Sequence, residues 1–416
     1  MGEKQKPWWL ILLCILIMAA SFSDKYWIIP WYWKYVCQIT IIGLALIWLL
    51  VHADFNRLAL IWDYFVIYLL PLLGIVIVSL TIWIWDFQVF TYISRGFSTI
   101  LYHIITICFV CAVVYLFGGK AIDYTVYSMI IANSLLVCYS VMTYGVQEFV
   151  TGLIILIKSA GIETTPAIKT LEVHDLAFAL GLYVVYYLIF EKGKRKWCLL
   201  LICTLFFFLG YKRIALLAIG GVVFVHLLFR KKTEETQIRL FQVLSWSSIF
   251  LCFAYVFIIE SGLFELIVDY LKLDTMGRKE LYAYFRPFYE LNPLYKGYGI
   301  GYVGRYLERG ASLFGDRKVV GLHNDIMVLY IELGFVGFTL WIWYEIRYRI
   351  LWVIKKFGMK NAILLWYGTI YTFITYTTDN TVFYTYINTI FMLLPLAYTV
   401  RAFEAKTERM SGENGK

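Results

Sequence analysis

Apolar stretches close to 20 residues long recur along the whole chain, separated by short polar connections. A helix of about 20 residues crosses the hydrocarbon core of a bilayer. Because backbone polar groups in lipid must pair within their own segment, each stretch predicts a helix. The sequence therefore predicts an all-α polytopic membrane protein with about twelve transmembrane helices. The expected spans lie near 8–22, 31–51, 63–85, 97–117, 121–143, 173–190, 197–211, 214–229, 241–259, 323–343, 361–377 and 381–400.

The composition agrees with a bilayer as the solvent. Hydrophobic residues make up 61% of the chain and charged residues 16%, with a mean hydropathy of +0.73. A soluble domain carries about 25% charged residues. The eight cysteines lie inside or beside apolar stretches, which predicts no disulfide framework. We expect one integral membrane domain over 1–416.

The distribution of basic residues predicts the orientation of the spans. With the N-terminus in the cytoplasm and the spans alternating, 21 of the 37 Lys and Arg residues fall in cytoplasmic segments. Nine of the others lie in one long outer segment, and long translocated segments count little in this rule. Both termini are therefore expected inside, with 404–416 as a cytoplasmic tail. This topology also accounts for most of the net charge of +9, so we expect no nucleic-acid partner.

Two outer connections are longer than a tight turn, at 144–172 and 260–322. Loops longer than about 12–15 residues are usually functional or disordered. The segment 260–322 is an extracytoplasmic loop rich in aromatic residues, which argues against disorder. We expect it to contain short helices that lie on the membrane face.

Two basic motifs lie on the predicted outer face. The first is Lys212-Arg213 in a tight turn between two apolar stretches. These cations can reach for lipid phosphates, or Arg213 can bind a substrate phosphate through its bidentate fork. The second is Gly277-Arg278, with Tyr282 one helical turn further on and Arg286 after it. Its alternative is an ordinary charged surface loop.

Further along the same loop, the segment 293–301 reads Pro-Leu-Tyr-Lys-Gly-Tyr-Gly-Ile-Gly, in which glycine permits unusual backbone angles. The sequence His323-Asn324-Asp325 then opens an apolar stretch from the outer side. It offers a base and acceptors where free backbone N–H groups gather, although a histidine at this level is also often only interfacial.

Other polar residues also face the outer side. They begin another predicted span or fill the last outer hairpin, and structural roles are favoured over catalytic ones for them. They are Glu172, His174, Asp175, Asp379 and Asn380.

Taken in order, these motifs resemble the superfamily of O-antigen ligases and Wzy-type polysaccharide polymerases. The resemblance consists of an Arg in a tight outer turn, a Gly-Arg early in a long outer loop, a Pro-Leu-x-Gly-x-Gly-like stretch, and His-Asn followed by Glu-Leu-Gly-x-x-Gly. The last of these, from His323 to Gly337, is the most specific. The chain departs from the pattern at Lys212, where many relatives have Ser, and in its aromatic-rich Pro-Gly stretch.

The resemblance implies an inverting, metal-independent glycosyl transfer from an undecaprenyl diphosphate-linked oligosaccharide, without a cofactor, on the outer face of the bacterial cytoplasmic membrane. His323, Arg278 and Arg213 are the expected catalytic residues. His323 is the expected base or orienting group, and the two arginines are expected to neutralise the leaving diphosphate. The expected substrate-binding residues are Lys212, Asn324, Arg286, Tyr282, His174 and Glu172.

Alternatives stay open at this point. A polymerase that builds a capsule or similar polysaccharide is favoured because the His-Asn-Asp and Thr-Thr-Asp-Asn sequences look like those of capsular polymerases. A ligase would transfer the finished glycan to another acceptor. A flippase would place charges inside the membrane and show a repeat between its halves, and no repeat is visible. A non-catalytic scaffold in a polysaccharide assembly complex is the remaining alternative.

Overall fold

The computed structural model describes residues 6–23, 29–159, 165–171, 174–210, 212–272, 275, 277–309 and 321–413. All regular secondary structure in these residues is helical. Each of the twelve predicted spans overlaps one helix. These helices are α1 (Trp8–Phe22), α2 (Trp33–Val51), α3 (Phe55–Trp85), α4 (Phe90–Phe117), α5 (Ala121–Tyr144), α8 (His174–Ile189), α9 (Arg195–Gly210), α10 (Arg213–Phe229), α11 (Glu234–Glu260), α15 (Asp325–Trp343), α17 (Met359–Tyr376) and α18 (Thr385–Glu413).

Six helical stretches are long and apolar enough to cross a membrane, among the residues described. They begin at α2, α3, α4, α11, α15 and α18, and the stretch from α4 continues through the turn η1 (Gly118–Lys120) into α5. Helices α1, α8 and α10 are shorter but also apolar. The protein is therefore an all-helical integral membrane protein, and the number of twelve spans stays a prediction.

Some helices begin or end away from the predicted positions for local chemical reasons. Helix α11 starts seven residues before its apolar stretch because the Thr233 side chain accepts the Thr236 N–H at 3.4 Å, and two glutamates follow in the first turn. Helix α15 continues beyond Trp343 through the π-helical turn η4 (Tyr344–Tyr348) into α16 (Arg349–Phe357).

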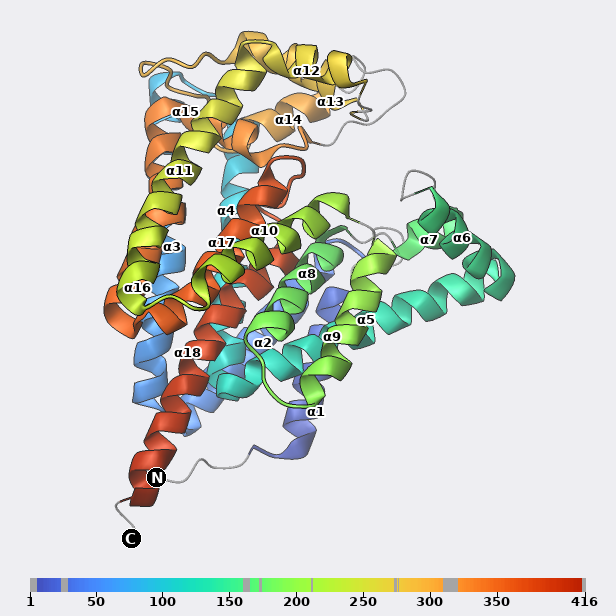
Figure 1. The fold of residues 1–416 in the computed structure, drawn as a ribbon, viewed down its shortest axis with the longest axis vertical. Helices are drawn as coiled ribbons and strands as arrows, with labels where there is room; N and C mark the ends of the chain where they lie inside the picture. Colours follow the sequence, from blue (N-terminus) through green and yellow to red (C-terminus); the bar gives the residue numbers. More distant parts are fainter. Residues whose placement is uncertain are drawn as a thin grey trace. The chain divides into compact units, whose positions relative to one another are not determined.

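The two long connections that are expected on the outer face contain short helices. The first holds α6 (Val146–Lys158) and α7 (Pro166–Leu171). The long segment 260–322 holds α12 (Leu263–Leu271), α13 (Arg278–Phe285), the turn η2 (Arg286–Phe288) and α14 (Tyr302–Arg309). Figure 1 labels its three α-helices. The expectation of short helices in this segment is confirmed, whereas their position on the membrane face stays a prediction.

The chain divides into two compact units. The first comprises 1–65, 105–224 and 384–416, and the second comprises 66–104 and 225–383. In the first unit, α8 packs against α9 and α18, and α1 packs against α2 and α5. In the second unit, α11 packs against α12, α15 and α17.

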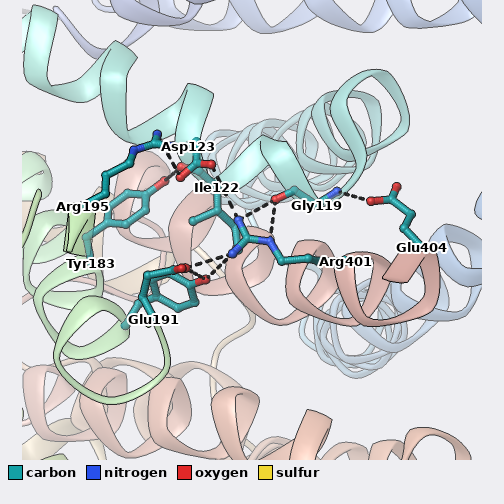
Figure 2. Close-up of polar contacts among 9 residues, drawn as sticks. Gly119, Ile122, Asp123, Tyr183, Glu191, Arg195, Arg401 and Glu404 are labelled. Atoms are coloured by element: carbon teal, nitrogen blue, oxygen red, sulfur yellow. Dashed lines mark hydrogen bonds and ion pairs between the residues drawn. The ribbon is translucent and has the colours of Figure 1, made fainter. Parts of the chain in front are cut away.

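Arg401 of α18 organises a polar network in the first unit (Figure 2). Its guanidinium donates to the Gly119 carbonyl at 2.9 Å and to the Glu191 carboxylate at 2.9 Å. Asp123 lies 3.8 Å from the same guanidinium. One turn further along α18, Glu404 accepts the Gly119 N–H at 3.1 Å and pairs with Arg57. Together these contacts fasten α18 to the turn η1 and to the helices beside it.

The glycine-rich stretch of the second unit crosses α15 in backbone-to-backbone contact. The N–H groups of Tyr298 and Gly299 both donate to the Glu332 carbonyl, at 3.1 and 2.7 Å. Helix α15 is kinked at Gly334, whose φ of 68° is in the left-handed region. A Cβ on Gly334 would lie 2.3 Å from the Lys296 carbonyl carbon, so no larger residue fits there.

Candidate functional site

His323 occupies a bend immediately before α15 in the second unit. Its φ of 51° places a non-glycine residue in the left-handed region, where histidine is one of the tolerated residues. Its side chain is 45% exposed, and its Nδ1 lies 3.8 Å from the Asp379 carboxylate. A carboxylate on one side of an imidazole helps to orient the ring. The other ring nitrogen, Nε2, is thereby left for another partner.

Asn324 fixes the start of α15 behind His323. Its side-chain oxygen accepts the Met327 N–H at 3.2 Å, as an N-cap residue does. Its side-chain nitrogen donates to the Tyr255 hydroxyl at 3.0 Å, and Tyr255 in turn donates to the Thr377 carbonyl at 2.6 Å. Asn324 is fully buried, so its contacts position the bend rather than leave its amide open to solvent.

Asp325 ties the same bend to the connection between α17 and α18. Its carboxylate accepts the Val382 N–H at 2.7 Å. Asp379 belongs to this connection, and its own carboxylate accepts the Asn380 N–H at 2.9 Å. Asp325 therefore holds the connection against the start of α15, and Asp379 of this connection lies beside His323.

Helix α13 brings Tyr282 to His323 and places Arg278 near Tyr282 and Tyr255. The Tyr282 hydroxyl donates to the His323 carbonyl at 3.4 Å. Burial raises the pKa of Tyr282, so the phenol stays a hydrogen-bond donor, while the nearby Arg278 cation opposes that rise. Arg278 starts α13 after Gly277, whose φ is 86°.

The Arg278 cation remains available to a ligand as far as the described residues go. It has no ion pair with a carboxylate of the described chain, and its buried Nε has no hydrogen-bond partner there. A partly buried guanidinium without a carboxylate partner is a site for an anion.

Arg286 is placed differently. It forms an ion pair with Glu265 of α12, and its guanidinium lies over Gly262 at the start of that helix. This pairing joins η2 to α12 and gives Arg286 a structural contact. Lys279, beside Arg278, is likewise paired with Asp269 at 2.5 Å.

The remaining predicted residues belong to the first unit or lie outside the described residues. Lys212 precedes α10, and its carbonyl accepts the Leu216 N–H at 3.2 Å, while Arg213 is exposed at the first position of the helix. His174 is the first residue of α8, and Glu172 lies outside the described residues. Asp175 has a structural contact, because its two carboxylate oxygens accept the N–H groups that start α18, each at 2.8 Å.

The structure thus brings Arg278, Tyr282, His323 and Asn324 into one cluster and adds two residues to it. Tyr255 carried no sequence signal, because it lies within an apolar stretch. Asp379 was visible as a polar residue of the last hairpin, but only the fold places it beside His323. We refer to Tyr255, Arg278, Tyr282, His323, Asn324 and Asp379 as the His323 cluster.

The His323 cluster combines a histidine, a carboxylate and an arginine in an integral membrane protein. Such a combination is typical of an enzyme that acts at a membrane surface. Residues 176–342 match the family model Wzy_C, described as O-antigen ligase. This match confirms the predicted resemblance and includes Arg213, Arg278, the glycine-rich stretch and His323. Glu172, His174 and Asp379 lie outside the matched segment. No curated protein matches the chain.

Proposed function

We propose that this protein is a polysaccharide polymerase of the bacterial cytoplasmic membrane. It joins undecaprenyl diphosphate-linked oligosaccharide repeat units on the outer face, with both termini in the cytoplasm. The observation that carries the proposal is the pairing of His323 with Asp379 in the same cluster as the Arg278 guanidinium. A base and a cation are the two groups that this reaction needs from a protein.

The reaction forms one glycosidic bond and breaks one phosphate ester bond. The acceptor hydroxyl oxygen attacks the anomeric carbon of the donor, on the side opposite the diphosphate, and the configuration inverts. The bond from that carbon to the phosphate oxygen breaks, and undecaprenyl diphosphate leaves with the electron pair. No sugar nucleotide is available outside the cell, so the lipid diphosphate supplies the driving force.

His323 is the proposed general base. Because its Nδ1 faces Asp379, its Nε2 takes the proton of the acceptor hydroxyl. The carboxylate stabilises the imidazolium that forms and keeps the ring in one orientation. Asn324 and Tyr282 are positioning residues, since they hold the backbone of the bend through the α15 N-terminus and the His323 carbonyl.

Arg278 is the proposed binding site for the diphosphate. Its planar guanidinium offers paired donors to phosphate oxygens, and it neutralises the charge that grows on the leaving group. The positive charge thus comes from the protein itself, so the proposed reaction uses neither a metal ion nor a cofactor. The contribution of Arg213, in the first unit, remains a prediction from its sequence motif.

A ligase is the second candidate, supported by the description of the matching family. It would use the same chemistry with a different acceptor. A flippase for the same lipid-linked glycan has no need for a base held against a carboxylate, and the match to a ligase family favours an enzyme over a flippase or a scaffold.

The test compares wild type, Arg278→Ala and His323→Ala at matched membrane levels in a strain without its own copy. Lys279→Ala is the control, because Lys279 adjoins Arg278 but is paired on the surface. A polymerase predicts loss of the polymer ladder in both variants, single repeats on the carrier, and a rate at least about 100-fold lower. Full-length polymer stranded on the carrier would instead identify a ligase. Normal ladders in both variants would overturn the assignment of the site.

A further inference from the structure

A row of stacked tyrosines lies on one side of the long outer loop in the second unit. The Tyr298 and Tyr302 rings are stacked at 4.2 Å between centroids, and Tyr302 stacks on Tyr92 at 5.0 Å and on Tyr306 at 5.8 Å. The Tyr306 hydroxyl is 3.1 Å from that of Tyr284 on α13. We call these five residues the tyrosine platform.

The platform is not a closed core. Tyr284, Tyr298, Tyr302 and Tyr306 are all partly exposed, whereas Val303 and Leu307 on the same helix α14 are buried. Helix α14 therefore turns its aliphatic residues inward and its aromatic residues toward the surface. Within the described residues, the Tyr298 and Tyr302 hydroxyls have no hydrogen-bond partner. As far as the described part of the chain shows, these hydroxyls are left for a ligand.

Charged side chains of both signs border the platform. Glu308 pairs with Arg305 at 2.9 Å and with Arg95 at 3.2 Å. Arg309 lies over the Tyr92 ring at 5.1 Å from its centroid, and Lys296 pairs with Asp86 near Tyr298. The border thus offers both donors and acceptors around an aromatic surface.

The platform is connected to the His323 cluster through one short helix. Arg278 and Tyr282 of α13 belong to the cluster, and Tyr284 of the same helix belongs to the platform. Tyr284 lies six positions after Arg278, which is about 9 Å along the helix axis and about 120° around it. A glycan held at Arg278 therefore reaches the platform by passing around the side of α13, from the face of the His323 cluster to the face of Tyr284.

From this arrangement we infer that the tyrosine platform binds sugar residues of the glycan whose end reacts at the His323 cluster. A sugar ring has an apolar C–H face that packs on aromatic surface and a rim of hydroxyls that bond to phenols, carboxylates and guanidinium groups. A lipid chain would favour a continuous aliphatic surface without free hydroxyls. The inference rests on the proposed function, since it names where that reaction's glycan is held.

The first test measures binding alone. The probe is the surface polysaccharide of the source strain, freed from its carrier by mild acid and immobilised. The full-length His323→Ala protein, purified in detergent, is compared with versions that also carry Tyr302→Ala, Tyr302→Phe or Tyr270→Ala. Tyr270 is the control, because it is 86% exposed on α12 of the same loop but outside the platform. Tyr302→Ala is expected to weaken binding about 3- to 10-fold and Tyr302→Phe less, while Tyr270→Ala leaves binding unchanged.

The second test measures polymer length in cells with His323 intact. Tyr302→Ala is expected to shift the ladder to shorter chains, because a weakly held glycan dissociates between additions. The inference would be overturned if the Tyr302→Ala and Tyr270→Ala proteins bound the polysaccharide equally well and melted at the same temperature. Failure of the proposed function would give a different result. The polymer ladder would then be normal in the His323→Ala strain, whether or not Tyr302→Ala weakens binding of the polysaccharide.

Discussion

The imidazole Nδ1 of His323 lies 3.8 Å from the carboxylate of Asp379, across 56 positions of sequence. That distance is too long for a hydrogen bond but within the range of an ion pair when the imidazole is protonated. Two further contacts, from Asp325 to Val382 and from Asn324 through Tyr255 to Thr377, hold the two segments together. The packing of the second unit therefore determines the position of Asp379 beside His323.

Asp379→Asn is expected to lower the rate of glycosyl transfer about tenfold or more while leaving substrate binding nearly unchanged. The amide keeps the size of the side chain but removes the charge that stabilises the imidazolium. Initial rates at several donor concentrations, with the protein in native membranes, would separate the two effects. A variant that transfers at the wild-type rate would show that Asp379 only holds the hairpin.

Substitution of Arg278 is expected to lower activity without lowering stability, whereas substitution of Arg286 is expected to lower stability. Arg278→Lys keeps the charge but loses the bidentate fork, so activity should fall about tenfold with unchanged melting temperature. Arg286→Ala should lower the melting temperature, because Glu265 loses its partner.

The double variant Glu265→Ala/Arg286→Ala tests the structural role of Arg286. Removing both partners should cost less than the sum of the two single substitutions. Additive losses of stability would contradict the pairing, and loss of activity at full stability in Arg286→Ala would return Arg286 to the substrate-binding residues.

Gly334→Ala is expected to destabilise the second unit by about 1–3 kcal/mol. A methyl group there would meet the Lys296 backbone and would have to adopt a φ of 68°. Thermal melting of the purified protein would measure the loss. Gly43→Ala is the matched control, since Gly43 lies in α2 with nothing within 4 Å of an added Cβ. Equal melting of both variants would contradict the close crossing.

Arg401→Ala is expected to cost about 1–2 kcal/mol of stability, because Asp123 and Glu191 lose a shared cation (Figure 2). Arg401→Lys should restore little, since a single ammonium group cannot reach the Gly119 carbonyl and Glu191 together. Arg409→Ala, an exposed arginine on the same helix, is the control for charge. A melting temperature of Arg401→Ala equal to that of the control would refute the fastening role.

Much of the fold followed from the apolar stretches, because a helix in lipid is determined locally by length and hydrophobicity. Helix starts were less predictable where polar residues extend a helix beyond its apolar stretch, as Thr233 does for α11. The sequence predicts that the span ends at Trp343, but the helix continues through η4, where acidic and basic residues follow the apolar stretch.

The site divides in the same way between local and long-range causes. The motifs around Arg278 and His323 were recognisable because each is contiguous, and the family match includes both. Tyr255 and Asp379 were not assignable to the site, because their partners are 69 and 56 positions away. The glycine pattern of Gly297–Gly301 is weak evidence for a site by itself, and only the structure shows that this segment packs against the backbone of α15.

By itself, the sequence determined that this chain is a helical membrane protein with O-antigen ligase-type motifs in its second half. Hydrophobic length and contiguous motifs are local properties, and they survive without knowledge of the fold. Only the tertiary structure decided that Asp379 faces His323, that Arg286 is paired while Arg278 lacks a carboxylate partner among the described residues, and that four stacked tyrosines and Tyr284 lie together. Each of these depends on which distant segments pack together, and residue types alone do not specify that packing.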